Sequence, residues 1–429
     1  MAEAEAHGIV IVGGGICGLA TALALHRKGI PSLVLEKSRS LRADGAGIGV
    51  HANGWRALEQ LGVAAELRET AQLITVYHDV WQQGDKTSRE KVPVRMELRC
   101  LNRKDLIEAL AKDIPAGAIR FGCRVAAVAA DPGGGHGAVL TMADGTAMKA
   151  KVKLACNRWS YIQYHIYIYP LPEIELFQVL IGCEGTYSAV ARYLGLSPVR
   201  TIPRPVLRGF TWYPHGHSFD TEFLRLRVGG FFIGRLTITD NLVHFFVTMP
   251  KQPTADVIKD LKRVRDHALK DLQDVECPGE IIEIVRGSDP ESLNLVTEFW
   301  YRPPWEVVLG SFQRGAVTVA GDAMHAMGPF IGQGGSAGLE DAVVLARSLA
   351  RAAVDDSDNA REKKVVGEAI GEYVRERRPR LALLSLESFV MGALLVRSPS
   401  PVTKLVCVAV LILLGSKSLR HANYDCGRL

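Results

Sequence analysis

The residues that point most directly to chemistry form a glycine-rich turn near the start of the sequence. Residues 13–18 read GGGICG and satisfy the pattern GxGxxG. Gly13 allows a tight turn, Gly15 lets the backbone approach a pyrophosphate, and Gly18 lets the following helix pack closely on the preceding strand. From Ile16 onward, the first N–H groups of that helix offer the positive end of a helix dipole to phosphates. The turn therefore predicts a dinucleotide-binding site.

An acidic residue completes this pattern at the end of the next apolar segment. Glu36 closes the segment Ser32–Glu36, where a dinucleotide-binding unit carries its ribose-binding acid. Its carboxylate is expected to accept hydrogen bonds from the adenosine ribose and to disfavour binding of a 2′-phosphate. The adjacent Lys37 belongs to the same predicted cofactor site. A glycine-rich turn without a nucleotide is the alternative, but the flanking strand, helix and acid favour the nucleotide. The turn alone does not distinguish FAD from NAD.

A second glycine-rich motif lies near the other end of the chain. Residues 321–342 read GDAMHAMGPFIGQGGSAGLEDA. This stretch resembles the GDAxHxxxPxxGQG signature of the class A flavoprotein monooxygenases, the aromatic hydroxylase group. The resemblance implies that one Asp hydrogen-bonds the ribityl chain of FAD and that a helix N-terminus faces the flavin pyrimidine, where it stabilises negative charge. The residues assigned to the cofactor in this way are Gly321, Asp322, Pro329, Gly332, Gln333 and Gly334. A plain helix cap is the alternative role of Asp322.

Other segments resemble the same family. The loop Arg42–Asn53 resembles the one that follows the ribose-binding acid, in which Gly47 lets the backbone pass close to the flavin. The RKDL stretch that begins at Arg103 resembles the RxxL motif, whose Arg contacts FAD; an ion pair with a nearby carboxylate is its alternative role. The match extends from residue 8 to about residue 350, and residues 332–350 and 421–429 indicate the plant monooxygenase group.

One motif departs from the family pattern. The family has DGxxSxxR after its middle strand, whereas this chain has Glu184 in place of the Asp and Arg192 one position late. In the family this motif is linked to both FAD and NAD(P)H. No second GxGxxG follows a strand, so NAD(P)H, the co-substrate that the resemblance implies, is expected to bind transiently without a Rossmann domain of its own. The absence of a CxxxxC pair near residues 45–55 argues against a disulfide reductase.

These motifs require a framework of alternating strands and helices. The run Gly8–Val12, the helical pattern Ile16–Lys28 with Gly29 as its cap, and Ser32–Glu36 form a βαβ unit. From about residue 197 to 250 the pattern changes to the short alternating runs of an antiparallel sheet. The predicted fold is α/β, with a Rossmann-like FAD-binding domain, an inserted, mostly antiparallel β-sheet substrate domain and a C-terminal helical tail. Further expected elements are helices at 53–61, 104–111, 255–274 and 339–354 and strands at 124–130, 138–142, 224–228, 231–236, 242–248 and 316–320.

The predicted domains alternate along the chain. Residues 1–195 and 301–355 form the two parts of the FAD-binding domain, residues 196–300 the substrate sheet, and residues 356–429 the helical tail. A Tyr- and Ile-rich segment, Ala155–Gln178, interrupts a strand that Met148–Leu154 would begin and Val179–Gly182 would end. We interpret this segment as a translated intron, because its last three residues can be encoded by a pyrimidine-rich stretch ending in CAG. A genuine loop is the alternative, although long loops are uncommon in compact domains.

Composition limits the remaining classes. The chain has 429 residues, 48% of them hydrophobic and 23% charged, with a net charge of +5. Its Lys and Arg residues are scattered, which argues against a nucleic-acid partner. Its eight cysteines form no CxxC pair or metal-like cluster and, with no room for a signal peptide, indicate a cytoplasmic protein. The apolar run Leu405–Gly415 is too short to span a bilayer, and either a buried helix or peripheral membrane contact explains it.

The combined prediction is an FAD-dependent monooxygenase. NAD(P)H would reduce the flavin, and reduced flavin would activate O2 to hydroxylate or epoxidise a small aromatic or isoprenoid substrate. No catalytic side chain is assigned, because the protein's part is position, electrostatics and water exclusion; His325 fits a packed structural role as well as proton transfer. The segment Leu224–Thr248 is expected to line part of the substrate pocket, with its phenylalanines either core or platform. The alternatives are an FAD-binding protein without turnover and a flavin-dependent reductase.

Overall fold

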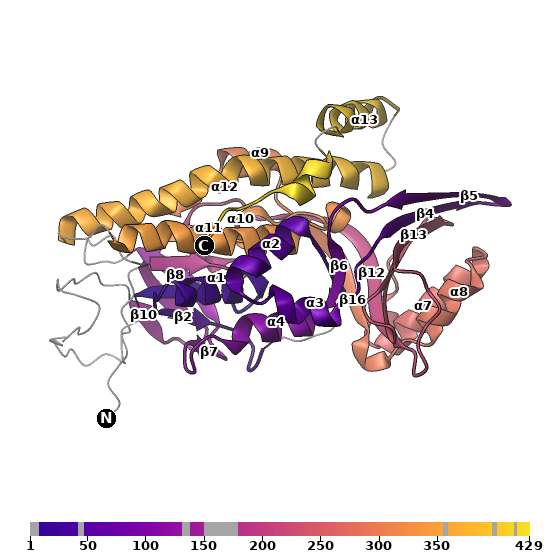
Figure 1. Ribbon diagram of the computed structural model, residues 1–429, viewed down its shortest axis with the longest axis horizontal. Coiled ribbons are helices and arrows are strands. Elements are labelled where there is room, and N and C mark those ends of the chain that lie inside the picture. Colours follow the sequence, from indigo (N-terminus) through magenta and orange to yellow (C-terminus); the bar gives the residue numbers. More distant parts are fainter. Residues whose placement is uncertain are drawn as a thin grey trace.

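The computed structural model describes residues 8–41, 47–130, 138–149, 179–354, 359–396, 401–415 and 418–429. A mostly parallel sheet and a second, larger sheet lie side by side, and the long helix α12 (Asn359–Val396) runs across the top of the view (Figure 1). The predicted α/β class with an inserted sheet and a helical tail is confirmed. No helix within these ranges has both the length and the apolar character needed to cross a membrane.

The first sheet is built from short strands that are buried at its centre and partly exposed at its edges. Its order is β17-β18-β11-β1-β2-β7, and all pairs are parallel except β17 with β18. The apolar runs at these positions suit strands that are covered on both faces. The bounds are β1 (Ile9–Val12), β2 (Ser32–Leu35), β7 (Ile119–Arg120), β11 (Val179–Gly182), β17 (Gln313–Arg314) and β18 (Val317–Val319).

Helices from both ends of the chain cover this sheet. Helix α1 (Ile16–Arg27) buries Gly18–Leu25, and Gly29 just beyond its end has a φ of +70°, as expected for a residue that closes the helix. It packs against α11 (Gly334–Val354) and α4 (Arg103–Lys112), while α11 also contacts α2 (Ala52–Leu61) and α12. Because α1 and α11 lie against each other, the two glycine-rich motifs that precede them meet at one edge of the sheet.

The second sheet has seven strands in the order β16-β12-β15-β14-β13-β4-β5. Its strands are β4 (Val76–Gln83), β5 (Lys86–Pro93), β12 (Arg200–Trp212), β13 (Glu222–Val228), β14 (Phe231–Thr237), β15 (Leu242–Thr248) and β16 (Asn294–Tyr301). The pairs are antiparallel except β4 with β13. The expected range 196–300 therefore omitted the hairpin β4–β5, which comes from the first third of the chain.

The two faces of the second sheet differ. Leu224, Leu226 and Val228 point toward α7 (Leu261–Asp274) and α8 (Gly279–Arg286), where they form a separate apolar core. These helices lie on the far side of the sheet from the rest of the molecule (Figure 1). The alternate residues of each strand point back toward the flavin-binding domain, because successive side chains in a strand face opposite sides.

Two sequence predictions need correction. The expected helix Ala255–Asp274 is two helices, α6 (Ala255–Ile258) and α7, because the side chain of Asp260 accepts a hydrogen bond from the backbone N–H of Lys262 and so begins a new helix. Of the two segments expected to form one strand, the described residues Met148 and Lys149 and the strand β11 lie in different sheets. Strand β10 (Ala147–Lys149) pairs with β9 (Ala138–Met142), whereas β11 pairs with β1. The suspected insertion Ala155–Gln178 lies outside the described residues.

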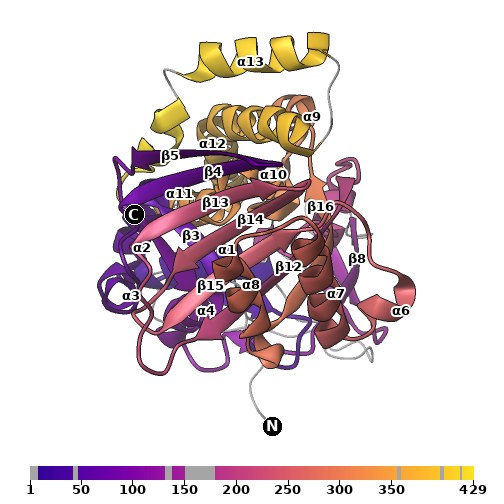
Figure 2. The same ribbon diagram turned by 90° about the vertical axis from the view of Figure 1, so that its right-hand side faces the viewer.

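The remaining elements connect these layers. They are the helices α3 (Ala64–Thr70), α5 (Ala189–Tyr193), α9 (Pro304–Leu309), α10 (Asp322–His325) and α13 (Pro401–Gly415), the strands β3 (Gly47–His51), β6 (Leu98–Asn102) and β8 (Val125–Ala130), and the 3-10 turns η1 (Pro290–Ser292), η2 (Pro329–Ile331) and η3 (Ser418–Asn423). Figure 2 shows α13 standing above α12, apart from the main body. The described part of the tail is mainly helical, as the sequence predicted.

Candidate active site

The first glycine-rich turn has the geometry that a pyrophosphate site requires. Gly13 has a φ of +104°, and a Cβ there would lie 2.6 Å from the carbonyl oxygen of Cys183. A Cβ on Gly18 would lie 1.9 Å from the carbonyl oxygen of Gly13, whereas a Cβ on Gly15 would meet no atom within 4 Å. Packing of the protein itself thus explains two of the glycines. Gly15 instead borders open space at the start of α1, where a phosphate would lie.

The acid of the ribose site is held against this turn. Glu36 is 2% exposed, and its carboxylate accepts hydrogen bonds from the backbone N–H groups of Gly14 at 2.7 Å and Ser38 at 2.8 Å. Lys37 follows it on the surface, exposed to solvent. Ile16 begins α1, and its partly buried side chain packs against the core. The fold therefore brings the predicted ribose-binding acid against the predicted phosphate-binding turn.

A large cavity lies between the two sheets. Its volume is about 1750 Å³, more than the roughly 300–1,000 Å³ of an ordinary ligand pocket. Residues from three distant parts of the sequence line it: Gly47, Arg103, Asp322, Pro329 and Gly332. These are five of the residues predicted to contact the flavin, and the volume is sufficient for a flavin ring and a second molecule.

Asp322 faces the cavity at the start of α10. Its limited access to bulk water raises the pKa of its carboxyl, and the positive charge of Arg103 and the proximity of His325 oppose that rise. A Cβ on Gly334 would lie 4.0 Å from its Oδ1, so the start of α11 is beside this carboxyl. This arrangement fits the roles predicted for Asp322 and the first N–H groups of α11, beside a ribityl chain and a flavin ring.

The turn before α11 combines exposed and buried residues. Pro329 is exposed toward the cavity, and Gly332 takes the left-handed conformation with a φ of +63°. Gln333, by contrast, is fully buried, and its Oε1 accepts a hydrogen bond from Asn53 Nδ2 at 2.8 Å. The side chain of Gln333 therefore fixes the turn from inside, and only its backbone is placed to meet a cofactor.

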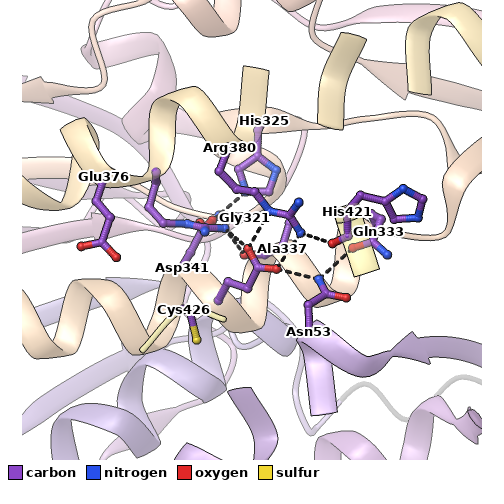
Figure 3. A network of polar contacts seen from close by, with 12 residues as sticks. Asn53, Gly321, His325, Gln333, Ala337, Asp341, Glu376, Arg380, His421 and Cys426 are labelled. Atoms are coloured by element: carbon purple, nitrogen blue, oxygen red, sulfur yellow. Dashed lines mark hydrogen bonds and ion pairs between the residues drawn. The ribbon is translucent and has the colours of Figure 1, made fainter. Parts of the chain in front are cut away.

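A buried charge network holds the Gly321 turn in place (Figure 3). Asp341 of α11 is fully buried and accepts three hydrogen bonds: from Gly321 N at 2.9 Å, His325 Nε2 at 2.6 Å and Arg377 Nε at 2.7 Å. Burial alone would raise the pKa of Asp341, but His325 and Arg377 outweigh burial and hold it well below its usual range. His325 is also fully buried, so its place in this structure is in the network rather than in the cavity wall.

The same network continues through the neighbouring carboxylate. Glu340 is fully buried, lies 2.7 Å from Arg377 Nη2, and accepts hydrogen bonds from Asn53 Nδ2 at 2.6 Å and Arg380 Nη2 at 3.1 Å. Two carboxylates of α11 are thereby matched by two guanidinium groups of α12. The network joins α2, α11, α12 and the Gly321 turn, and it was not predicted, because no local pattern links Arg377 to residues so far away in the sequence.

The wall opposite the flavin residues is rich in arginine. Arg204, Arg208, Arg225 and Arg227 project from β12 and β13 into the cavity. Arg225 lies over the ring of Tyr77 and donates a hydrogen bond to Asp79 at 2.6 Å, whereas Arg227 lies over Trp81 and Phe232. The alternation in EFLRLRV could have revealed these side chains, but not that the polar face meets a cavity instead of solvent.

Two cavity-lining groups lie close to the flavin residues. Burial lowers the pKa of Arg208, and the nearby charge of Arg103 lowers it further; its Nη2 donates a hydrogen bond to Asn294 Oδ1 at 2.7 Å. Burial, and then the charge of Arg208, lower the pKa of His244 to about 3, so this imidazole is neutral at neutral pH. A Cβ on Gly47 would lie 2.4 Å from His244 Cδ2, which explains the glycine in β3.

The phenylalanines expected in this region divide between the two faces. Phe231 and Phe245 are buried in the core against α7 and α8, although Phe231 also borders the cavity. Phe232 and Phe246 line the cavity. A Cβ on Gly234 would lie 2.0 Å from Phe246 Cε1, so this glycine makes room for the ring to lie across the sheet. Both expected roles, core and platform, therefore occur.

The side chains of Glu184 and Arg192, in the motif that departs from the family pattern, make hydrogen bonds to nearby backbone groups. The side chain of Glu184 accepts a hydrogen bond from Val190 N at 3.1 Å at the start of α5, and burial raises the pKa of its carboxyl despite that bond. Arg192 donates hydrogen bonds to the backbone carbonyl groups of Tyr187 and Ala126. Neither side chain lines the cavity, although Thr186 of the same motif does.

These features together fit FAD. Open space beside Gly15, a buried acid at Glu36 and a carboxyl at Asp322 that faces a cavity match the phosphates, ribose and ribityl chain of a flavin dinucleotide. The fold and site thus define a flavoprotein with a large cavity between its FAD-binding domain and an inserted sheet. The chain belongs to the FAD binding domain family, which it matches over residues 7–157 and 178–382, and within it to the plant group of class A flavoprotein monooxygenases.

Known proteins support this assignment. The chain is 44% identical to Monooxygenase 1 of Arabidopsis thaliana over 99% of its own length and 100% of the relative's. It is 31% identical to Monooxygenase 2 of the same plant, with 100% of both covered. Among solved structures, HpxO of Klebsiella pneumoniae in complex with FAD and uric acid has the same fold, with a TM-score of 0.71, 20% identity, and 97% of this chain and 96% of that one covered.

The contrast between two glycines provides a test of the phosphate site. We expect Gly15→Ala to raise the Kd for FAD by about tenfold or more, because the new methyl group enters the space of the pyrophosphate, while costing the apoprotein about 1 kcal/mol or less. We expect Gly18→Ala to cost about 2 kcal/mol or more, because its Cβ meets a backbone carbonyl. FAD titration and thermal unfolding of both apoproteins measure this. Unchanged FAD affinity in Gly15→Ala would place the phosphates elsewhere.

The buried network makes a second prediction. Arg377→Met should lower the free energy of unfolding by about 3–5 kcal/mol, because it leaves two buried carboxylates without their shared partner. The matched control is Lys112→Met, which removes a surface ion pair with Glu66 and should leave stability nearly unchanged. Denaturant unfolding compares the two variants. Equal effects would show that the network contributes no more than a surface pair.

Proposed function

We propose that this chain is an NAD(P)H-dependent monooxygenase that inserts one oxygen atom of O2 into an organic substrate carrying an anionic group. The observation that supports this best is the cavity in which Asp322 and the other flavin-side residues face an arginine-rich wall. The residues on the flavin side and the arginine residues thus border the same cavity.

In this proposal the cofactor supplies the redox chemistry, and the protein chain positions the reactants. FAD, held at Gly15, Glu36 and Asp322, supplies the reaction with electrons from NAD(P)H and the activation of O2. The chain holds the substrate against the flavin site, and the two walls of the cavity limit access of water. Asp341 and Arg377 fix the turn that carries Asp322, so that the carboxyl keeps its position. No side chain is required as a general base in this proposal.

The lining favours an aromatic acid as substrate. Arginine guanidinium groups match carboxylates with paired hydrogen bonds. The wall also carries Phe232, Phe246 and Trp81, which offer aromatic contacts to the body of the ligand. Among relatives, the salicylate hydroxylase of Pseudomonas putida, 26% identical over 90% of this chain, is named for such a compound. An isoprenoid substrate without a charged group would make no use of the guanidinium groups that line the cavity.

The Tyr-rich segment supports a separate proposal. The family match stops at residue 157 and resumes at 178, which agrees closely with an insertion at Ala155–Gln178. We infer that this segment is a translated intron. Sequencing of transcripts across the region tests the idea, and a majority of messages that carry the segment would contradict it.

Three activities are distinguished by one set of measurements. An anaerobic solution of the purified holoprotein should lose its visible flavin absorption on addition of NADPH and regain it in air. With 18O2 and a converted substrate, one labelled oxygen atom should appear in the product. Bleaching without oxygen incorporation indicates a reductase. A flavin spectrum that NADPH does not change indicates a flavin-binding protein without turnover.

The anion site can be tested without knowing the natural substrate. Binding of salicylate can be measured through the change that it causes in the flavin spectrum. The Kd for salicylate should rise by about tenfold or more in Arg208→Gln, because a charge-assisted hydrogen bond is lost. Binding of neutral salicylamide should change little. Arg263→Gln serves as control, since that side chain is 70% exposed on α7, away from the cavity. An equal loss for salicylate and salicylamide would contradict the anion site.

A further inference from the structure

Large apolar side chains are exposed mainly on one side of the molecule. Leu73, Val92, Phe121, Tyr187 and Trp212 are scattered over other elements, but the remaining exposed ones gather on α9, α12 and α13. Both views place these three helices on the same side (Figures 1 and 2). The gathered residues are Trp305, Val308, Leu309, Leu383, Val402, Leu405, Val406 and Val408. We call this set the apolar side.

Helix α13 presents a continuous apolar stripe to the outside. Val402, Leu405 and Val406 are 72%, 71% and 56% exposed, and the spacing of three and four residues places them on one helical face. The buried Cys407 and the half-buried Leu411 lie on the face toward the body. A helix with this much exposed apolar surface is costly in water unless another apolar phase covers it.

The charges that flank this stripe in the sequence favour a lipid surface as that phase. From residue 388 to 424 the sequence contains no Asp or Glu, but it contains Arg397, Lys404, Lys417 and Arg420. Basic residues beside an apolar helix are attracted to anionic headgroups while the apolar face enters the interface. A second copy of the chain would carry the same positive charges to the contact, and the two copies would repel each other there.

We propose that the apolar side binds a lipid surface that contains anionic headgroups, with α13 lying in the plane of the interface. Helix α13 also contributes Leu411 to the lining of the cavity, and Met391 of α12 lines it nearby. Binding would therefore place one end of the cavity next to the lipid, so that amphipathic anions reach it from the membrane surface. The binding of lipid itself does not depend on the proposed function, whereas the delivery of amphipathic anions to the cavity rests on it.

Sedimentation of the holoprotein with lipid vesicles tests the proposal. Phosphatidylcholine vesicles are compared with vesicles that also contain phosphatidylglycerol. We expect the protein to bind the mixed vesicles more tightly, and added salt to weaken that binding. The double variant Leu405→Asp, Val406→Asp should bind the mixed vesicles at least about tenfold more weakly, because it places two charges in the apolar stripe. The matched control is Leu73→Asp, which adds one charge at another exposed leucine, 42% exposed, on a different part of the molecule.

Each outcome has a definite meaning. Retention of the flavin spectrum shows that each variant is folded. Equal vesicle binding by parent and double variant, or no binding to either kind of vesicle, overturns the proposal. A dimer that forms with rising protein concentration, is lost in the double variant and occurs without vesicle binding would assign the apolar side to a second copy of the chain, and it would overturn the proposal as well.

Discussion

The structure depends on one buried carboxylate, Asp341, and on the guanidinium group of Arg377 that faces it. A fully buried carboxylate is stable only where hydrogen bonds and opposite charge replace water. Asp341 obtains them from the backbone of Gly321, from His325 and from Arg377, and its neighbour Glu340 shares the same arginine. Removal of Arg377 would take an opposite charge from both buried carboxylates at once. The flavin turn and the C-terminal helix are therefore held as one unit.

This constraint explains how distant parts of the chain form a single site. Helices α1 and α11 lie side by side, so the pyrophosphate turn and the Asp322 turn meet at the same edge of the parallel sheet. The second sheet then closes the cavity from the opposite side with arginine and aromatic side chains. Its other face is apolar and packs on α7 and α8, so a single sheet serves both as the core of one lobe and as the wall of the site.

Local motifs gave reliable predictions where a residue's role depends on backbone geometry. Gly13 and Gly18 are required by contacts within a short strand–turn–helix unit, and the structure shows the close approaches that exclude a side chain. The predictions failed where local signals competed with capping or pairing. Asp260 divides an expected helix, β10 and β11 belong to different sheets, and the hairpin β4–β5 joins a sheet built mostly from residues more than a hundred positions later. Strand pairing over such distances leaves no local trace in the sequence.

The sequence by itself determined the class of fold, the FAD-binding motifs and the family, because each depends on residue types at short, fixed spacings. Only the tertiary structure decided what these motifs face. It showed that Gln333 is a buried support, that His325 belongs to a charge network, and that Arg208, Arg225 and Arg227 line a cavity instead of a solvated surface. The alternating pattern of a strand predicts which residues share a face. What covers that face depends on elements that pack against it from elsewhere in the chain.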